Sequence, residues 1–334
     1  MANATEAYKQ KDFKQALEYF NKAMAVDTNN LPAYWGSAAA HGNLNQYKEA
    51  ESDLTRAIER STNNVSSSYS YLMRGCFFEQ VTNYDKAVDD FSKSAQINPS
   101  FPLAYVNRAY AYNLSGHYDL SIIDCNMAIS LDPDCADAYR YKATALYRQQ
   151  KYDKAITAYD AAIQLNPNDD WLYGARALAY SQLNNYTATI KDFDRSIQLD
   201  PKSAVTFANR GLVKSRIGDF KGGIADCYIG ISLDTNCFLA CNNLAWLLST
   251  APTPKLRDGQ KAVAYATHAC ELTSWKEPYS LGTLAAACAE VGDFTNAVKW
   301  ESKCILIGLP EKDMPQARKE LHLFEDNKPY HTNK

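Results

Sequence analysis

Small and large apolar residues recur along the chain in a pattern that repeats every 34 residues. In each period a small residue precedes a large one by three positions, as Ala109 precedes Tyr112, so both lie on one face of a helix. Further along, a small residue precedes a large one by four positions, as Ala155 precedes Tyr159. Each period therefore predicts two amphipathic helices.

A proline ends four successive periods and separates one predicted helix pair from the next. These residues are Pro99, Pro133, Pro167 and Pro201, each 34 residues after the last. Proline cannot continue a helix, so each one marks a link between pairs. Self-similarity at this fixed length predicts stacked units, in which each pair covers the apolar face of its neighbour.

The repeated residues resemble the tetratricopeptide repeat (TPR), whose pattern is small-x-x-aromatic, then Ala-x-x-x-Phe, then Pro. The third period shows it with Gly75, Phe78, Ala87, Phe91 and Pro99. The resemblance covers almost the whole chain. It implies an all-α fold, a right-handed α–α superhelical solenoid of helix-turn-helix repeats that ends in a polar-faced capping helix.

The array is expected to occupy residues 1–310, and the capping helix and tail residues 311–334. The first repeat is incomplete, because its first helix has only the residues up to about Gln10. Residues 249–260 carry two prolines and a glycine, which predicts an insertion loop. Residues 242–298 resemble a variant repeat pair near the C-terminus of many bacterial TPR proteins. The repeats are expected to begin near residues 1, 31, 68, 102, 136, 170, 204, 238 and 278.

Basic and acidic residues recur sixteen positions apart in the regular repeats. Helical geometry places the two positions opposite each other across a helix pair, so we expect ion pairs within repeats. Acid accompanies Arg in four repeats, and the exception is the one repeat with Lys. The pairs are Arg74 with Asp90, Arg108 with Asp124, Lys142 with Ala158, Arg176 with Asp192, and Arg210 with Asp226.

The net charge of −3 gives no basic surface for nucleic acid or for an anionic membrane. No apolar run approaches the ~20 residues that span a bilayer, and the N-terminus lacks an apolar signal core, so a cytoplasmic location is expected. The nine cysteines form no C-x-x-C pair, and several occupy core positions, where a reduced thiol packs as a small hydrophobe.

Motifs of enzymes are absent from the sequence, which has no G-x-x-x-x-G-K, H-E-x-x-H or G-x-S-x-G. The closest metal-like spacing, His268 and Cys270, would put the two side chains on diverging sides of a helix. We therefore expect no catalytic residue, metal or cofactor, and a non-enzymatic role.

The first helices of TPR pairs line the concave groove of the superhelix, so the resemblance predicts an adaptor that binds a protein or an extended peptide there. Amide side chains can bond to a peptide backbone, and aromatic ones offer anchor pockets. Simple packing between repeats is the alternative for each aromatic residue. The expected groove residues are Trp35, Tyr69, Asn107, Tyr110, Arg140, Tyr147, Trp171, Asn209, Asn242, Asn243, Trp246 and Tyr279.

Arg140 is the one strong charge in this set, so the ligand is expected to carry an acidic group near its middle. The carboxylate clamp by which co-chaperone TPR domains bind heat-shock proteins needs basic residues around a central Asn. No frame around Asn107, Asn209 or Asn243 supplies them, which argues against such a clamp. A self-associating scaffold, joined through the incomplete first repeat, is the alternative function.

Overall fold

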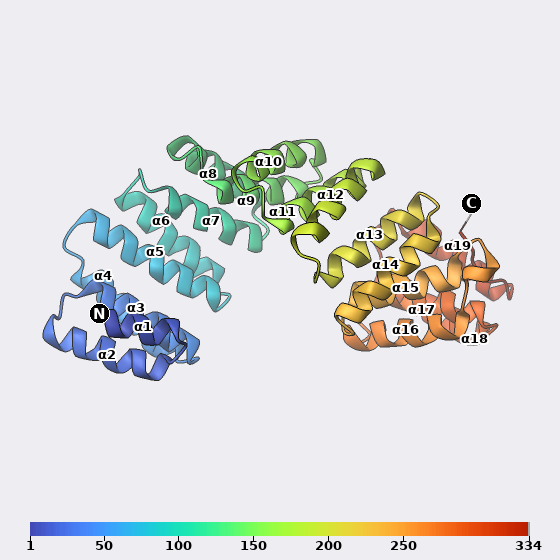
Figure 1. Ribbon diagram of the computed structural model, residues 1–334, viewed down its shortest axis with the longest axis horizontal. Coiled ribbons are helices and arrows are strands. Elements are labelled where there is room, and N and C mark those ends of the chain that lie inside the picture. Colours follow the sequence, from blue (N-terminus) through green and yellow to red (C-terminus); the bar gives the residue numbers. More distant parts are fainter. Residues whose placement is uncertain (333–334) are drawn as a thin grey trace. The chain divides into compact units, whose positions relative to one another are not determined.

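The structure of the protein is a computed structural model that describes residues 1–332. The helices follow one another in pairs (Figure 1). No strand occurs in these residues, which form nineteen α-helices and one short 3₁₀ helix. We call the two members of a pair its first and second helix. The chain divides into two compact units, unit 1 over residues 1–167 and unit 2 from Asn168 onward.

The helices of unit 1 form five pairs. They are α1 (Ala2–Lys9), α2 (Phe13–Val26), α3 (Leu31–Asn43), α4 (Tyr47–Arg60), α5 (Asn64–Gln80), α6 (Tyr84–Ile97), α7 (Pro102–Leu114), α8 (Tyr118–Leu131), α9 (Ala136–Arg148) and α10 (Tyr152–Leu165). Each first helix from α3 on packs against the second helices on both sides of it.

The helices of unit 2 form four pairs and a final single helix. They are α11 (Asp170–Gln182), α12 (Tyr186–Leu199), α13 (Ala204–Arg216), α14 (Phe220–Leu233), α15 (Phe238–Thr250), the 3₁₀ helix η1 (Pro254–Leu256), α16 (Gly259–Leu272), α17 (Pro278–Glu290), α18 (Phe294–Ile307) and α19 (Met314–Glu325). The all-α solenoid is confirmed, and the right-handed sense of the superhelix stays a prediction.

In every pair except α15–α16, the turn is closed by one residue in the left-handed region, as at helix C-termini generally. An aromatic residue, Tyr or Phe, begins the second helix two residues later. Polar N-caps help to start these helices: the Asp12 and Asp219 side chains accept hydrogen bonds from the backbone N–H groups of Gln15 and Gly222. The left-handed residues are Lys11, Asn45, Thr82, Gly116, Gln150, Asn184, Gly218 and Gly292.

Small residues allow the paired helices to approach, as the repeat pattern predicts. Ala109, Ala143 and Ala177 are fully buried. A Cβ atom at Gly223 would lie 2.6 Å from the backbone oxygen of Gly211 on the facing helix, so the α13–α14 crossing has no room for a methyl group. The glycines of α14 thus serve close packing as well as costing helix propensity.

The predicted ion pairs are confirmed in all four repeats that carry both charges. Arg108 is typical: its Nε and Nη2 atoms donate to the two carboxylate oxygens of Asp124, each at 2.7 Å. Its Nη1 atom donates to Ser92 Oγ of the preceding second helix at 2.9 Å. In the second repeat Ser37 takes the place of Arg, and its hydroxyl donates to Asp53 at 2.6 Å.

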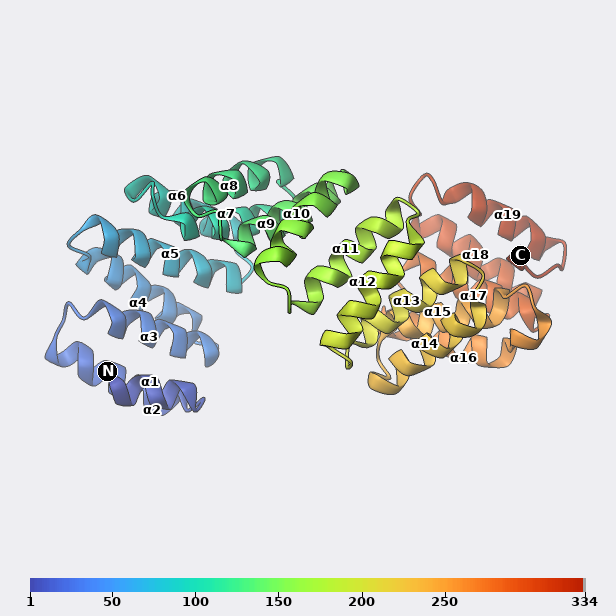
Figure 2. The ribbon, with the colours of Figure 1, turned by 45° about the horizontal axis from the view of Figure 1, so that its top comes forward.

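In the eighth repeat the loop between α15 and α16 is fixed by Arg257. Its Nε atom donates to Glu290 Oε1 and its Nη1 atom to the Ala251 carbonyl, both at 2.8 Å. Beyond α18, the last helix α19 packs on α18 and α17 (Figure 2). It buries Ala317 and Phe324 and leaves Arg318 and Lys319 exposed.

Candidate partner-binding surface

The first helices of unit 1 carry a row of aromatic side chains that touch across repeats. The Trp35 and Tyr69 rings, from α3 and α5, have centroids 4.6 Å apart, and the Trp35 indole N–H donates to Ser70 Oγ at 3.2 Å. Tyr69 also lies 6.5 Å from Phe101, yet 37% of Tyr69 remains exposed. Trp35 therefore packs between repeats, while Tyr69 both packs and faces solvent.

Further along unit 1, Tyr110 of α7 stacks on Tyr141 of α9 with centroids 4.8 Å apart. Asn107 is half-buried, and its amide donates to the Leu103 carbonyl of its own helix at 2.8 Å. Sequence periodicity had indicated Tyr110 and Asn107 but not Tyr141, which lies two positions before the small Ala143.

Two buried acceptor atoms on the first helices α5 and α7 lack a hydrogen-bond donor within the described residues. They are Oε2 of Glu79 and Oδ1 of Asn113, both buried. Burial raises the pKa of Glu79 to about 7. The Asn113 amide donates to the Tyr141 carbonyl at 2.9 Å, which leaves its oxygen turned away from that bond. A buried acceptor without a donor is uncommon and calls for a partner.

The sequence analysis missed both acceptors, although they occupy the same repeat position, four residues after the first small residue. Tyr147 occupies that position in the next repeat, where its ring meets Tyr152 edge-on with centroids 5.4 Å apart. Arg140 of α9 is half-buried and takes part in interactions within the chain, as does Tyr147. An acidic ligand therefore no longer follows from Arg140.

The first helices of unit 2 place their predicted residues differently. Trp171 lies at the start of α11, is 42% exposed and also has contacts within the chain. Asn209 is half-buried on α13. Asn242 of α15 is half-buried, and its buried Oδ1 atom has no donor within residues 1–332.

Asn243 does not project into a groove. The residue is 5% exposed, and its amide donates to the Ala208 carbonyl of α13 at 3.1 Å. This bond ties α15 to α13 across a repeat boundary, so we correct the prediction and assign Asn243 to packing between repeats.

One further predicted residue, Trp246, is contacted by a segment that follows α19. Residues 330–332 return to the first helices of unit 2, where the Tyr330 ring lies 5.9 Å from that of Trp246. The Thr332 backbone N–H donates to the Thr250 carbonyl at 2.8 Å, and His331 bonds to Glu290 at 2.7 Å. A short segment is thus held at α15 by an aromatic contact and a backbone hydrogen bond.

Tyr279 of α17 is nearly half exposed but is not free. Its hydroxyl donates to Asp313 Oδ2 at 2.6 Å, which links α17 to the residue before α19. Burial and this hydrogen bond raise the pKa of Tyr279. The contact favours a structural role at the C-terminal end.

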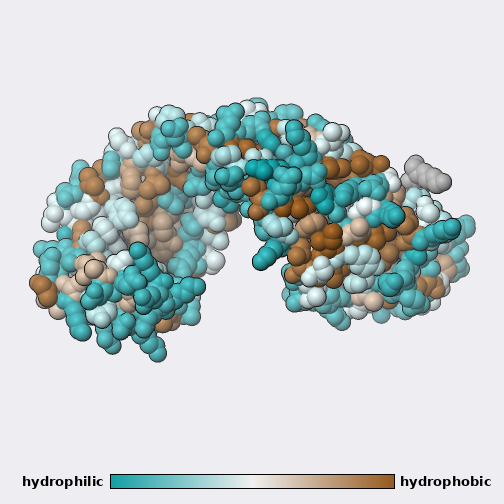
Figure 3. Space-filling model, in the orientation of Figure 1, coloured by the Kyte–Doolittle hydropathy of each residue, from teal (hydrophilic) through white to brown (hydrophobic). Residues whose placement is uncertain are grey.

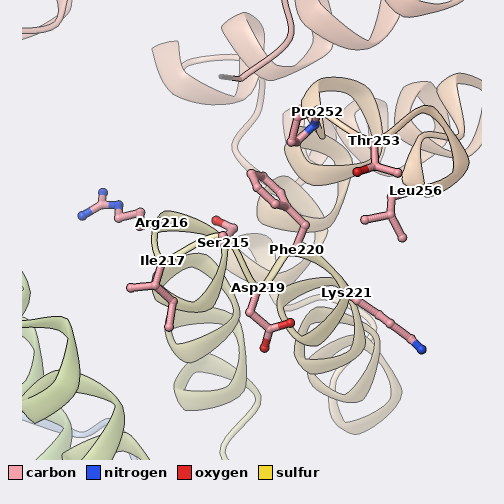
Figure 4. A pocket seen from close by; sticks show the side chains of 10 residues that line it. Ser215, Arg216, Ile217, Asp219, Phe220, Lys221, Pro252, Thr253 and Leu256 are labelled. Atoms are coloured by element: carbon pink, nitrogen blue, oxygen red, sulfur yellow. The ribbon is translucent and has the colours of Figure 1, made fainter. Parts of the chain in front are cut away.

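Unit 2 also has a surface pocket of about 590 Å³ between the α13–α14 turn and the loop after α15. Figure 4 shows Phe220 pointing from the start of α14 toward Pro252, while Arg216 points away. Figure 3 shows apolar patches (brown) among polar residues on the visible face of both units.

No group of three potential metal ligands is present in residues 1–332. Burial raises the pKa of the Cys125 and Cys227 thiols to about 12, so they are protonated and serve packing. None of the helices within the described part of the chain is long and apolar enough to span a membrane.

Comparison with protein families gives three matches. The description "Tetratricopeptide repeat" belongs to two of them, one matching residues 7–73 and the other residues 68–101, 103–135 and 172–203. A third family, described as "TPR repeat", matches residues 143–184. The matched segments lie in both units, and residues 68–101, 103–135 and 172–203 each correspond to one helix pair.

Similarity to named proteins is confined to short segments. The chain is 33% identical over 95 residues to "Translocon at the outer membrane of chloroplasts 64" of Pisum sativum, covering 28% of this chain and 16% of that protein. It is 37% identical over 54 residues to "Hsp70-Hsp90 organizing protein 3" of Arabidopsis thaliana, covering 16% of this chain and 10% of that one. The chain thus spans less than a fifth of either relative.

Solved structures match much more of the chain at low identity. One chain of the "APC/C hetero-tetramer Cut9-Hcn1" matches 85% of this chain over 54% of its own length, with a TM-score of 0.61 and 19% identity. A tetratricopeptide repeat protein from Parabacteroides merdae matches 72% of this chain and 94% of its own, with a TM-score of 0.55 and 18% identity. At these identities the matches bear on the fold alone.

Proposed function

Because this chain belongs to the tetratricopeptide repeat family, we propose that it is a non-enzymatic adaptor that binds an extended segment of a partner protein along its first helices. An extended segment offers a regular row of backbone N–H groups and alternating side chains, which suits a surface built from repeated helices. All nine cysteines are unpaired, and reduced thiols suit the cytoplasm, so a cytoplasmic location is part of the proposal.

One observation in unit 1 carries the proposal. On the first helices α5 and α7, the buried oxygens of Glu79 and Asn113 have no donor among the described residues, and the Asn113 amide donates to the carbonyl of Tyr141, on whose ring Tyr110 stacks. If the Glu79 and Asn113 side chains turn outward on binding, backbone N–H groups of a bound segment would satisfy these oxygens, while Tyr69 and Tyr110 contact its side chains. The contact of residues 330–332 with α15 illustrates the same combination within the chain.

Two of the similar proteins are named Hsp70-Hsp90 organizing proteins. The basic residues of a carboxylate clamp are missing around each candidate Asn of this chain, so a heat-shock C-terminus is not part of our proposal.

Replacement of Glu79 by Leu tests the proposal. An unpaired buried acceptor costs free energy, so Glu79→Leu should keep or raise the stability of unit 1 by about 1 kcal/mol. The same change should weaken partner binding at least tenfold. The partner is first recovered by crosslinking in an extract of the source cells with the parent chain, and its affinity for each variant is then measured by biolayer interferometry.

A pair of tyrosine variants supplies the matched control. Tyr69 on α5 and Tyr228 on the second helix α14 are each 37% exposed. Tyr69→Ala should weaken the same partner, and Tyr228→Ala should not. If neither Glu79→Leu nor Tyr69→Ala reduces affinity, the first helices of unit 1 are not the binding surface.

Self-association remains the alternative function, and the exposed Val26 at the end of α2 favours it. This side chain is 90% exposed, beside a surface pocket that also includes Met1 and Tyr19. Sedimentation equilibrium over a wide concentration range decides between the two functions. A mass that rises with concentration in the parent, and not in Val26→Lys, supports the scaffold.

A further inference from the structure

Two surface pockets in unit 1 occupy equivalent positions two repeats apart. One lies between α4, α5 and α6 and has a volume of about 660 Å³, and the other lies between α8, α9 and α10 and has a volume of about 600 Å³. Each is formed by one first helix and the second helices on both sides of it. The fold is the same in both, so their differences come from the side chains.

Opposite charges balance one another in the pocket at α5. Arg74 donates to both carboxylate oxygens of Asp90 at 2.7 and 2.9 Å. Lys86 lies 3.3 Å from Glu51, and the remaining charged side chains are Asp89 and Lys93. Three cations therefore face three carboxylates.

The pocket at α9 has fewer acidic side chains than the pocket at α5. Lys142 replaces Arg74, Ala158 replaces Asp90 and Thr157 replaces Asp89. Asp119 is the one carboxylate among the lining residues, against three lysines. Ala161 replaces Lys93, which makes one wall apolar as well.

Two of the lysines have no counter-charge. Asp119 Oδ1 accepts a hydrogen bond from the Gln149 amide, whose oxygen accepts one from Lys151 Nζ, both at 2.7 Å. Within residues 1–332, neither Lys142 nor Lys154 has a hydrogen bond or ion pair from its side chain. Their positive charges remain available at the edge of the pocket.

Apolar side chains form the rest of the wall. Ile123 of α8 is 61% exposed, and Ile122 and Leu146 lie beside it in the lining. A contiguous apolar wall with a few convergent charged groups, in a cavity of several hundred Å³, is the usual composition of a small-molecule site.

We propose that this pocket binds a small amphipathic carboxylate, an aliphatic or aromatic body that carries one carboxylate group. The carboxylate would lie between the ammonium groups of Lys142 and Lys154, and the body would cover Ile122, Ile123 and Leu146. Binding of this ligand is separate from partner binding, because the second helices α8 and α10 form two sides of the pocket, whereas the partner is proposed to lie along the first helices.

Octanoate is the test ligand, and 8-anilinonaphthalene-1-sulfonate, an aromatic anion that fluoresces in apolar surroundings, is the reporter. In the parent chain, octanoate should displace the reporter and lower its fluorescence. Isothermal titration calorimetry with octanoate alone should give a stoichiometry of one site per chain. Octanol, which has the same body without the charge, should bind at least tenfold more weakly.

Ala158→Asp is the decisive variant, because it introduces the acid that the four repeats with an Arg–Asp ion pair have at this position. The new carboxylate should pair with Lys142 and weaken octanoate at least tenfold without loss of helix content. The double change Lys142→Gln with Lys154→Gln should have the same effect and covers the case in which Ala158→Asp does not fold. Lys202→Gln, at an exposed lysine outside the pocket, should leave binding unchanged.

Two results would overturn the proposal. One is the absence of octanoate binding by the parent chain at millimolar concentration. The other is binding that survives both Ala158→Asp and the double lysine change, since the ligand would then lie elsewhere.

Discussion

Removal of Arg108 from its ion pair is expected to destabilise unit 1 strongly. In Arg108→Met the carboxylate of Asp124, whose side chain is 6% exposed, would lose both hydrogen bonds from the guanidinium. Breaking a buried pair by removing one partner costs about 3–5 kcal/mol. The Arg108 side chain is 19% exposed, so water can reach part of the site. We therefore expect a loss of about 2–3 kcal/mol, at or below the lower end of that range.

The companion change Asp124→Leu tests whether the loss comes from the pair. Replacement of both partners leaves no unpaired charge, so Arg108→Met with Asp124→Leu should recover about half of the loss. Lys142→Met is the matched control, because its repeat has Ala158 where the others have Asp. That variant removes a cation without leaving a buried acid and should cost less than about 0.5 kcal/mol.

Urea unfolding of the four proteins, followed by far-UV circular dichroism, gives the coupling energy from a double-mutant cycle. We expect a coupling of about 1.5–3 kcal/mol between Arg108 and Asp124. A coupling below about 0.5 kcal/mol, or an equal loss in Lys142→Met, would refute the reasoning that the acid needs the guanidinium.

Three further changes test other parts of the fold. Gly223→Ala should lower the stability by about 1–3 kcal/mol despite the better helix propensity of Ala, because the new methyl group would meet the Gly211 carbonyl. Gly174→Ala should raise the stability by up to ~1 kcal/mol, because the atom closest to its new methyl group would be 3.7 Å away. If thermal unfolding showed both variants shifting the melting temperature in the same direction, the packing argument would be contradicted. Ala143→Leu should cost about 1–3 kcal/mol, whereas the exposed Ala225→Leu should cost little, and an unchanged melting temperature for both would show the register to be wrong. Burial raises the pKa of Glu301 from 4.5 to about 8, so the folded state holds the proton more tightly than the unfolded state and stability should fall as pH rises between these values. Glu301→Gln should reduce this dependence of stability on pH, measured by urea unfolding at a series of pH values. The same pH dependence in the variant and the parent would disprove the assignment.

The sequence predicted those parts of the fold that each repeat determines locally. A small residue every 34 positions fixes which helix faces touch, so the burial of Ala143 and Ala177 and the pairing of Arg with Asp followed from spacing alone. The hydrogen bond from Ser37 to Asp53 was not predicted, because an uncharged hydroxyl takes the place of the guanidinium as the donor.

Side-chain surroundings on the first helices could not be predicted from spacing. Asn209 and Asn243 hold equivalent positions, yet Asn243 is buried because its amide reaches the Ala208 carbonyl. Whether a carbonyl lies within reach depends on the local distance between helices, which periodicity does not determine. The contact of Tyr330 with Trp246 was also unpredictable, since residues after α19 follow no repeat.

The third hydrogen bond of the arginines that form ion pairs within their repeats bears on how unfolding spreads along the array. Arg74, Arg108 and Arg210 each reach back to the preceding second helix, at Thr55, Ser92 and Asp194. Such bonds add to the coupling between neighbouring repeats, which in a linear array decides whether the repeats melt together or separately. Lys142 makes no such bond to α8 within the described chain. We therefore expect weaker coupling at the α8–α9 boundary than at the α6–α7 boundary, and amide hydrogen exchange should detect partial opening at α8–α9 at the lower free energy.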